Sequence, residues 1–297
     1  MEKKQSEKKY FDKAEAGIHA LFLLCGVISV GFVLAISIYL IISGIPAIAK
    51  IGFTDFLFGK VWQSTAVEAK FGILPFILTS IYGTAGAVLI GVPIGLFTAV
   101  FLSKVASKRV AGLIRSAVNL LAGIPSVVYG LVGMIILVPM IQKQFKLASG
   151  ATLLAAIIVL SIMILPSIVN VADTALLAVP REYEEASLAL GATETETYFK
   201  VSLHAAKSGV AASIVLGIGR AIGEAMAIIM VSGNVANMPK LLGSVRFLST
   251  AIASEMSYAA VGSLQREALF SVGLVLFLFI MLINVILDLV IRGGSEK

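Results

Sequence analysis

The sequence contains little charge, one cysteine and two histidines. Asp, Glu, Lys and Arg make up 13% of its 297 residues, against roughly 25% in an average soluble domain. The single cysteine, Cys25, excludes an intrachain disulfide. His19 and His204 lie far apart, and neither belongs to an H-E-x-x-H motif or a cysteine cluster. We therefore expect no metal site and no catalytic residues, and the chain is not predicted to be an enzyme.

Motifs that bind nucleotides are also missing. There is no G-x-x-x-x-G-K-[ST] loop to hold ATP phosphates. Residues 217–223, GIGRAIG, resemble a dinucleotide fingerprint, but the last glycine comes one position too late and no strand precedes it. We expect this chain to bind no cofactor.

The basic excess does not indicate a nucleic-acid partner. The formal net charge is +6, but Lys and Arg are scattered through the short segments between apolar runs instead of gathering on one face. Membrane orientation explains these residues better than binding to nucleic acid.

Apolar residues dominate the composition. They make up 59% of the chain, and the mean hydropathy is +1.01, which places the chain in a lipid bilayer. Runs of about 20 apolar residues can cross the hydrocarbon core, and only helices or closed barrels satisfy their own backbone there. The runs lack the alternation of barrel strands. We predict an all-α membrane protein surrounded by lipid, with six transmembrane helices near residues 20–43, 74–102, 113–141, 151–175, 210–232 and 269–291.

The distribution of Lys and Arg predicts that both termini lie in the cytoplasm. In that orientation the cytoplasmic segments carry more Lys and Arg than the external ones. The first apolar run exceeds the roughly 7–15 residues of a signal-peptide core, so we interpret it as an anchor. The predicted division is a cytoplasmic tail at 1–19, a first span with its external loop at 20–71, a five-span core at 72–292 containing a cytoplasmic elbow at 179–204, and a cytoplasmic C-terminus at 293–297.

Small residues and proline predict how the spans pack and bend. Gly91 with Gly95, and Gly219 with Gly223, have the G-x-x-x-G spacing that lets helix backbones approach closely. Pro125 falls inside a predicted span, where it can bend the helix. In the external segment 234–267, the sequence RFLSTAIASEMSYAA fits one face of a short helix. That helix could cross the outer mouth of a pathway or rest at the membrane interface.

Arg220 and Glu224 are charged residues within the fifth predicted span. An Arg near the bilayer centre costs about 2.5–3.5 kcal/mol on insertion scales unless a partner or water compensates it. Their spacing of four predicts a shared helical face. Either the two neutralise each other, or Arg220 lines a translocation pathway for an anion and Glu224 keeps the anion from binding too tightly. Other polar residues at the spans are predicted to form helix–helix hydrogen bonds or to lie at the interface: Asn119, Asn170, Asp173, Asn284 and Asp288.

The longest polar passage, EYEEASLALGATETETYFKVSLH, predicts two short helices joined at Gly191. Pro180 can occupy the first turn of a helix, with acidic residues near the positive end of its dipole. Gly191 can adopt the positive φ that ends a helix. Thr193 and Glu196 form a T-x-x-E capping box that starts the second helix.

The spacing within this elbow resembles the EAA signature of ABC-transporter permeases, which reads E-A-A, three residues, G, nine residues, I-x-L-P. The matching positions are Glu185, Ala186, Gly191 and Leu203, whereas Ser187, Val201 and His204 depart from the pattern. The resemblance implies that the elbow docks in a groove of a cytoplasmic ATPase. The residues implied in docking are Glu184, Glu185, Ala186, Leu190, Gly191 and Ala192.

Four segments widen the resemblance to residues 71–292. They are FGILPFILTSIYGT from Phe71, AGIPSVVYGLVG from Ala122, VPREYEEASLALGAT from Val179 and GRAIGEAMAIIMVSGN from Gly219. Together they are similar to the phosphate-importer permeases of the PstC family. The resemblance implies a type I ABC importer permease fold in the bacterial plasma membrane. It further implies a homologous second permease, a cytoplasmic ATPase dimer that uses ATP and Mg, and an external phosphate-binding protein.

Other functions stay open at this point. The chain could be the sister permease, or a permease for another oxyanion such as molybdate or sulfate. A secondary anion transporter built on Arg220 and Glu224 would need no ATPase, but the inverted repeats that would support it are not evident. A membrane scaffold or sensor could use the elbow without moving a substrate.

Overall fold

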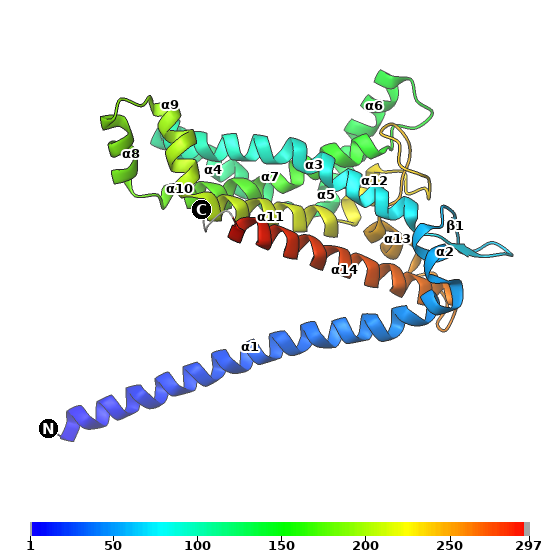
Figure 1. Ribbon diagram of the computed structural model, residues 1–297, viewed down its shortest axis with the longest axis horizontal. Coiled ribbons are helices and arrows are strands. Elements are labelled where there is room, and N and C mark those ends of the chain that lie inside the picture. The colour runs from blue at the N-terminus through cyan, green and yellow to red at the C-terminus, as the bar shows by residue number, and fades with distance from the viewer. Residues whose placement is uncertain (1, 294–297) are drawn as a thin grey trace.

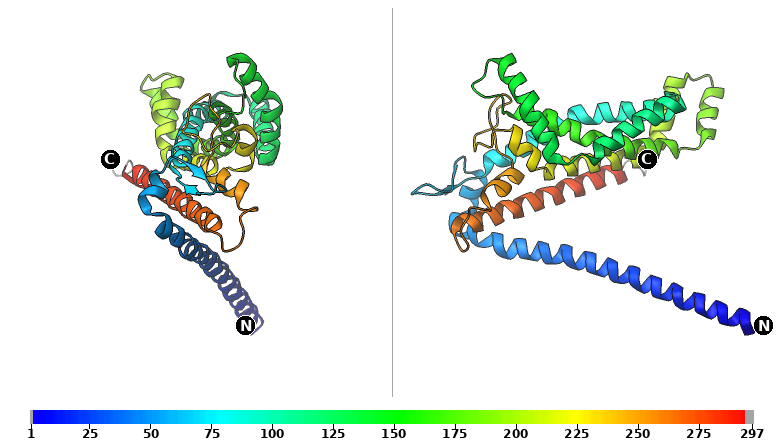
Figure 2. Two further views of the ribbon diagram at one scale, coloured as in Figure 1. Left: turned by 90° about the vertical axis from the view of Figure 1, so that its right-hand side faces the viewer. Right: turned by 180° about the vertical axis from the view of Figure 1, so that it is seen from behind.

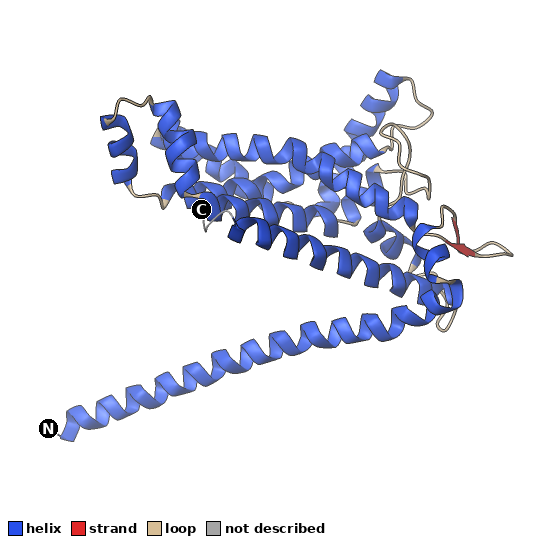
Figure 3. Cartoon of the chain, viewed as in Figure 1, coloured by secondary structure: helices blue, strands red, loops and turns tan. Residues whose placement is uncertain are grey.

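The computed structural model describes the backbone of residues 2–293 and the side chains of 15, 18–287 and 289. Helices make up most of it (Figure 3). The first half contains α1 (Glu2–Ile51), α2 (Phe53–Phe58), β1 (Trp62–Gln63), β2 (Lys70–Phe71), α3 (Leu74–Val100), the π-helix η1 (Phe101–Val105), α4 (Lys108–Gly123), α5 (Ser126–Val132), the π-helix η2 (Gly133–Leu137) and α6 (Val138–Phe145). The second half contains α7 (Leu153–Leu177), α8 (Arg181–Ala189), α9 (Glu194–Glu196), the π-helix η3 (Thr197–Ser202), α10 (Leu203–Ala205), α11 (Lys207–Gly223), α12 (Met226–Val231), α13 (Leu248–Glu255) and α14 (Leu264–Gly293).

Among the described residues, five helical stretches are long and apolar enough to cross a membrane. They are Ile18–Ile51, Leu74–Val105, Ser126–Phe145, Leu153–Leu177 and Leu264–Leu287. A sixth candidate is a bent pair, Glu194–Ala205 with Lys207–Gly223, whose two parts meet at 76°. The prediction of an all-α membrane protein is therefore confirmed, and four predicted spans (20–43, 74–102, 151–175 and 269–291) coincide with single long helices.

The third predicted span, 113–141, is wrong as one continuous helix. It is divided into α4, α5 and the helical segments that follow, with a break at Ile124 and Pro125. Ile124 has an extended backbone with φ −72° and ψ 126°, because the ring of a following proline disfavours the helical conformation. The apolar stretch long enough to cross a membrane begins after the break, at Ser126.

The centre of the bundle is α7, packed between α3 and α11 (Figure 1). Ile164 and Ile168 of α7 are completely buried. They fill the space left by Gly91 and Gly95 of α3: a Cβ atom at either glycine would lie 2.7 Å from an isoleucine side-chain carbon. The predicted close packing through Gly91 and Gly95 is confirmed, since only glycine lets the two helices approach this far.

The second predicted glycine pair has no packing partner within the described part of the chain. A Cβ atom at Gly219 or at Gly223 of α11 would meet no other atom within 4 Å. This face of α11 is open, so the expectation that the pair packs helices together is wrong within this chain.

The first helix, α1, diverges from the bundle (Figure 2). It contacts α14 near its C-terminal end, where Ser271 Oγ donates to the carbonyl oxygen of Gly44 and the rings of Tyr39 and Phe270 meet edge to face at 5.6 Å. The apolar side chains before this contact are exposed. A bilayer or another subunit must therefore cover them.

Polar segments gather at the two ends of the bundle (Figure 1). The elbow built from α8, α9, η3 and α10 lies at one end, and α6, the β1–β2 hairpin and α13 lie at the other. In the hairpin, Trp62 pairs with Phe71 and Gln63 with Lys70 in antiparallel register. The short helix predicted in the external segment is confirmed as α13.

The glycine contact between α3 and α7 leads to a stability prediction. Gly95→Leu should destabilise the subunit by about 1–3 kcal/mol, because the added side chain overpacks against Ile168. Unfolding of the detergent-solubilised subunit measures the change.

Gly219→Leu is the matched control, because its site is open. Equal losses of stability in the two variants would contradict the packing assigned to Gly95.

Candidate functional site

The elbow has the two-helix construction predicted from the sequence. Gly191 ends α8 with φ +87°. Thr193 Oγ1 accepts the backbone N–H of Glu196 at 3.3 Å, and the Thr193 N–H donates to Glu196 Oε2 at 3.2 Å. Hydrogen bonds from Lys200 and Thr193 lower the pKa of Glu196 to about 2, so the capping carboxylate stays charged at physiological pH. Pro180 differs slightly from its prediction, since it is the N-cap residue of α8 and precedes the first turn.

Most of the residues predicted to dock on an ATPase lie at the exposed surface of the elbow. Glu185, Ala186, Leu190 and Gly191 are exposed, and Ala192 is half-buried. Leu190 is 91% exposed at the turn between the two helices. An apolar side chain in this position is typical of a surface that another protein covers.

Glu184 differs from the other predicted docking residues because its carboxylate points into the elbow. It forms an ion pair with Lys104 of η1 and accepts a hydrogen bond from Ser202 Oγ at 2.8 Å. Partial burial raises the pKa of Glu184, but the hydrogen bonds from Lys104 and Ser202 outweigh it, so the pKa lies below 4.5. Glu184 therefore ties the elbow to the end of α3, a contact that sequence reasoning missed because Lys104 lies 80 positions earlier.

Two further contacts fix the elbow. Ser187 Oγ and Thr197 Oγ1 lie 2.8 Å apart and join α8 to η3. The rings of Phe97 in α3 and Phe199 in η3 meet at 6.0 Å between centroids. The serine that departs from the EAA pattern thus makes a hydrogen bond that alanine could not make. Displacement of the elbow would pull on α3 through both the aromatic and the ionic contacts.

The fifth predicted span, 210–232, is broken at Glu224. Arg220 lies in the last turn of α11, whereas Glu224 follows the helix with an extended backbone, φ −69° and ψ 130°. The predicted shared helical face is therefore wrong, because the helix does not continue to Glu224. Glu224 Oε1 instead accepts the N–H of Ala227 at 3.0 Å, and the Glu224 carbonyl oxygen accepts Ser249 Oγ–H at 2.6 Å. Glu224 connects α11, α12 and α13.

Arg220 forms no ion pair with a carboxylate among the described residues. Its guanidinium donates to Ser167 Oγ at 3.3 Å. Ser167 lies near the middle of α7, which places the half-buried Arg220 midway along the length of that helix. The ion pair between Arg220 and Glu224, one of the two interpretations of the sequence, is not formed here. A half-buried cation without a counter-ion is suited to attract an anion.

Two of the predicted helix–helix contacts are confirmed in α7. Asn170 Nδ2 donates to Asn119 Oδ1 of α4 at 3.0 Å, and Asp173 forms an ion pair with Arg115 of α4 at 2.7 Å. Asn284 is exposed on α14. The side chain of Asp288 lies outside the described residues.

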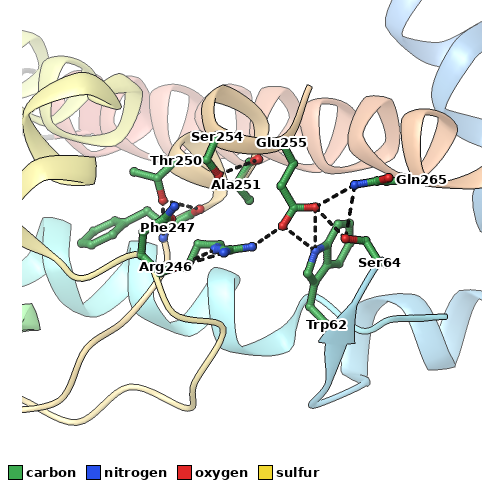
Figure 4. A network of polar contacts seen from close by, with 10 residues as sticks. Trp62, Ser64, Arg246, Phe247, Thr250, Ala251, Ser254, Glu255 and Gln265 are labelled. Carbon is green, nitrogen blue, oxygen red and sulfur yellow. Dashed lines mark hydrogen bonds and ion pairs between the residues drawn. The ribbon is translucent and has the colours of Figure 1, made fainter. Parts of the chain in front are cut away.

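At the end of the bundle opposite the elbow, the carboxylate of Glu255 at the end of α13 joins several segments (Figure 4). It accepts hydrogen bonds from Trp62 Nε1 at 3.1 Å, from Ser64 Oγ at 2.8 Å and from Gln265 Nε2 at 3.3 Å, and it forms an ion pair with Arg246. These residues come from the hairpin region, the loop before α13 and the start of α14. The network joins segments that are about 200 positions apart, and no sequence motif indicated it.

Comparisons with known proteins agree with this architecture. A family model described as "Binding-protein-dependent transport system inner membrane component" matches residues 91–293. The chain is 38% identical to the probable ABC transporter permease protein YqgH of Bacillus subtilis, over 88% of this chain and 86% of that protein. It is 33% identical to the phosphate transport system permease protein PstC of Pasteurella multocida, over 89% and 90%. A solved inward-facing structure of the MetNI methionine ABC transporter has the same fold, with a TM-score of 0.58 and 21% identity over 75% of this chain and 95% of that one.

The ion pair of Glu184 leads to a second stability prediction. Glu184→Gln and Lys104→Met should each destabilise the subunit by about 1.5–3 kcal/mol, because each leaves a partly buried charge without its partner. The double variant should lose less stability than the sum of the losses in the two single variants. The free energies of unfolding of the unmodified subunit, the two single variants and the double variant, measured in mixed micelles, give the interaction energy of the pair.

The exposed neighbour Glu185→Gln is the control and should change the stability by less than about 0.5 kcal/mol. Strict additivity of the two single variants would show that Glu184 and Lys104 do not interact.

Proposed function

The chain belongs to the family of binding-protein-dependent transport system inner membrane components, and we propose that it is the permease subunit of an ATP-driven importer of inorganic phosphate. It is a multi-pass inner-membrane protein, and its relatives are membrane subunits of ABC transporters. In this proposal the chain supplies the pathway and the transmission of movement. A partner ATPase, which uses ATP and Mg, supplies the chemical energy.

The choice of phosphate as the substrate rests on the position of Arg220. A guanidinium presents planar, bidentate donors that match phosphate oxygens, and Arg220 lies half-buried against the middle of α7 without a carboxylate partner among the described residues. The PstC name of several relatives supports phosphate over other anions. Sister permeases, and permeases for molybdate or sulfate, are the nearest alternatives, since a guanidinium also fits those ions.

The elbow supports coupling to a separate ATPase. Its tip is exposed and apolar at Leu190, while its base is fixed to α3 by the Glu184–Lys104 pair. When two ATPase subunits close on ATP, the docked elbows would move with them and carry the bundle from one opening to the other. Hydrolysis would reset the cycle. A secondary transporter would have no use for such an anchored, exposed elbow.

The remaining partners follow from the open surfaces. A homologous second permease would cover the open face of α11 and complete the pathway. An external phosphate-binding protein would dock at the end that carries Glu255, where a groove of about 810 Å³ lies between the hairpin region and residues 234–238.

Removal of the Arg220 charge should stop transport. In liposomes that contain both permeases and the ATPase, Arg220→Gln should lower the uptake of labelled phosphate at least about tenfold, since charged hydrogen bonds contribute about 1.5–3 kcal/mol each. Purification of the whole complex should be unchanged.

Arg109→Gln is the matched control, because Arg109 is exposed at the start of α4. Normal phosphate uptake by Arg220→Gln would exclude an essential role for this guanidinium. Stimulation of ATP hydrolysis by a loaded binding protein, measured with phosphate, molybdate and sulfate, would separate the alternative substrates.

A second prediction tests the docking of the elbow. Leu190→Asp should weaken co-purification with the ATPase about tenfold or more, because a leucine buried at an interface contributes about 1.5–3 kcal/mol. Leu241→Asp is the matched control, since Leu241 is also exposed but lies near the opposite end of the bundle. Undiminished ATPase binding by Leu190→Asp would contradict docking through the tip.

A further inference from the structure

A polar strip runs from Arg220 along α7 toward the elbow. We define it by Arg220, Ser167, Asn170, Asn119 and Thr174. On α7, positions 167, 170 and 174 are spaced by three and four and share one helical face. Arg220 of α11 donates to Ser167, and Asn119 of α4 accepts from Asn170. Ser167 and Asn170 lie about 4.5 Å apart along the axis of α7.

The described chain leaves the polar strip partly uncovered. Asn119 and Thr174 are exposed, and the other three residues are half-buried. Glycines border the strip on both sides, and a Cβ atom at any of them would meet no other atom within 4 Å; they are Gly112 and Gly123 of α4, and Gly219 and Gly223 of α11. Amide groups are costly to expose to lipid. This face must therefore adjoin water or another polar protein surface.

The charge along the strip decreases toward the elbow. Arg220 carries a positive charge with no carboxylate partner among the described side chains. Near the elbow end, Arg115 is neutralised by Asp173, which accepts from its guanidinium at 2.7 and 3.0 Å. Along α7, the uncharged pair of Asn119 and Asn170 lies between the contacts of these two arginines. An anion moving toward the elbow would exchange a charged donor for neutral ones.

Hydrogen-bond donors are available in the asparagine pair. Asn119 uses its side-chain oxygen to accept from Asn170, and its own amide N–H groups have no acceptor among the described residues. Neutral N–H groups bind an anion more weakly than a guanidinium does. A permease needs such a decrease, because an ion that binds too tightly is not released.

We propose that Asn119 and Asn170 form an uncharged anion-binding station on the elbow side of Arg220, from which phosphate leaves toward the cytoplasm. The substrate and the direction rest on the proposed function. The station itself requires only that the polar strip be a water-filled wall with a positive potential.

The lone cysteine makes a direct test possible. In a Cys25→Ser background, Asn170→Cys places a single thiol on the strip. The complete complex in liposomes is treated with a sulfonate-bearing and a trimethylammonium-bearing methanethiosulfonate, and each rate is divided by the rate with a free thiol. We expect the anionic reagent to be favoured about tenfold or more, as clefts with a positive potential concentrate anions. Arg220→Gln should reduce this preference, and inorganic phosphate should slow the labelling.

Asn284→Cys on α14 is the matched control, because Asn284 is also an exposed asparagine of a membrane helix but does not belong to the strip. It should react slowly with both reagents. An unreactive thiol at position 170, or one without preference for the anionic reagent, would overturn the station.

Phosphate uptake by liposomes that carry the Cys25→Ser complex, in which Asn119 and Asn170 are intact, separates this inference from the proposed function. Anion-selective labelling, together with no phosphate uptake by that intact complex and no protection by phosphate, would support a wall that attracts anions and overturn phosphate as the substrate. Phosphate uptake with no anion-selective labelling would retain the proposed function and overturn the station.

Discussion

The whole architecture depends on the fact that lipid offers no hydrogen-bond partner to a peptide group. A chain in the hydrocarbon core must satisfy its own backbone, so each interruption of a helix needs compensation. At the break after α11, the Glu224 carboxylate accepts the N–H of Ala227, and the Glu224 carbonyl oxygen accepts the hydroxyl of Ser249. At the break after α4, the carbonyl oxygen of Leu121 accepts both the N–H of Ile124 and the hydroxyl of Tyr129. Both breaks are thus stable, well-defined features of the fold.

Helix α3 connects the two ends of the molecule. Near its start, Ser80 Oγ accepts the N–H of Leu248 at the base of α13. Beyond its end, Lys104 forms the ion pair with Glu184 in the elbow. Between these contacts, glycines hold α3 closely against α7. Contacts at both ends of α3 and along its length thus connect the elbow with the opposite end of the bundle.

The sequence predicted those parts of the fold that depend on local chemistry. The long apolar helices, the glycine turn at Gly191, the capping box at Thr193 and the close packing at Gly91 follow from composition and short spacings. The break at Glu224 was missed because the apolar run continues through it, and the features that stabilise it come from α12 and α13. Because the helix was taken to continue through this break, Glu224 was considered as an ion-pair partner for Arg220. The contact of Glu184 with Lys104 depends on tertiary structure, which a short motif cannot reveal. The roles of the docking residues and of Arg220 in transport stay predictions.

The Glu255 network also has a consequence for the synthesis and membrane insertion of the protein. During synthesis Trp62 emerges early, Arg246 and Glu255 much later, and Gln265 only at the start of the last helix. The carboxylate cannot gather its donors until the insertion machinery has released nearly the entire chain. A product truncated before Glu255 would therefore leave Trp62 and Ser64 without the acceptor that joins the hairpin region to the rest of the bundle.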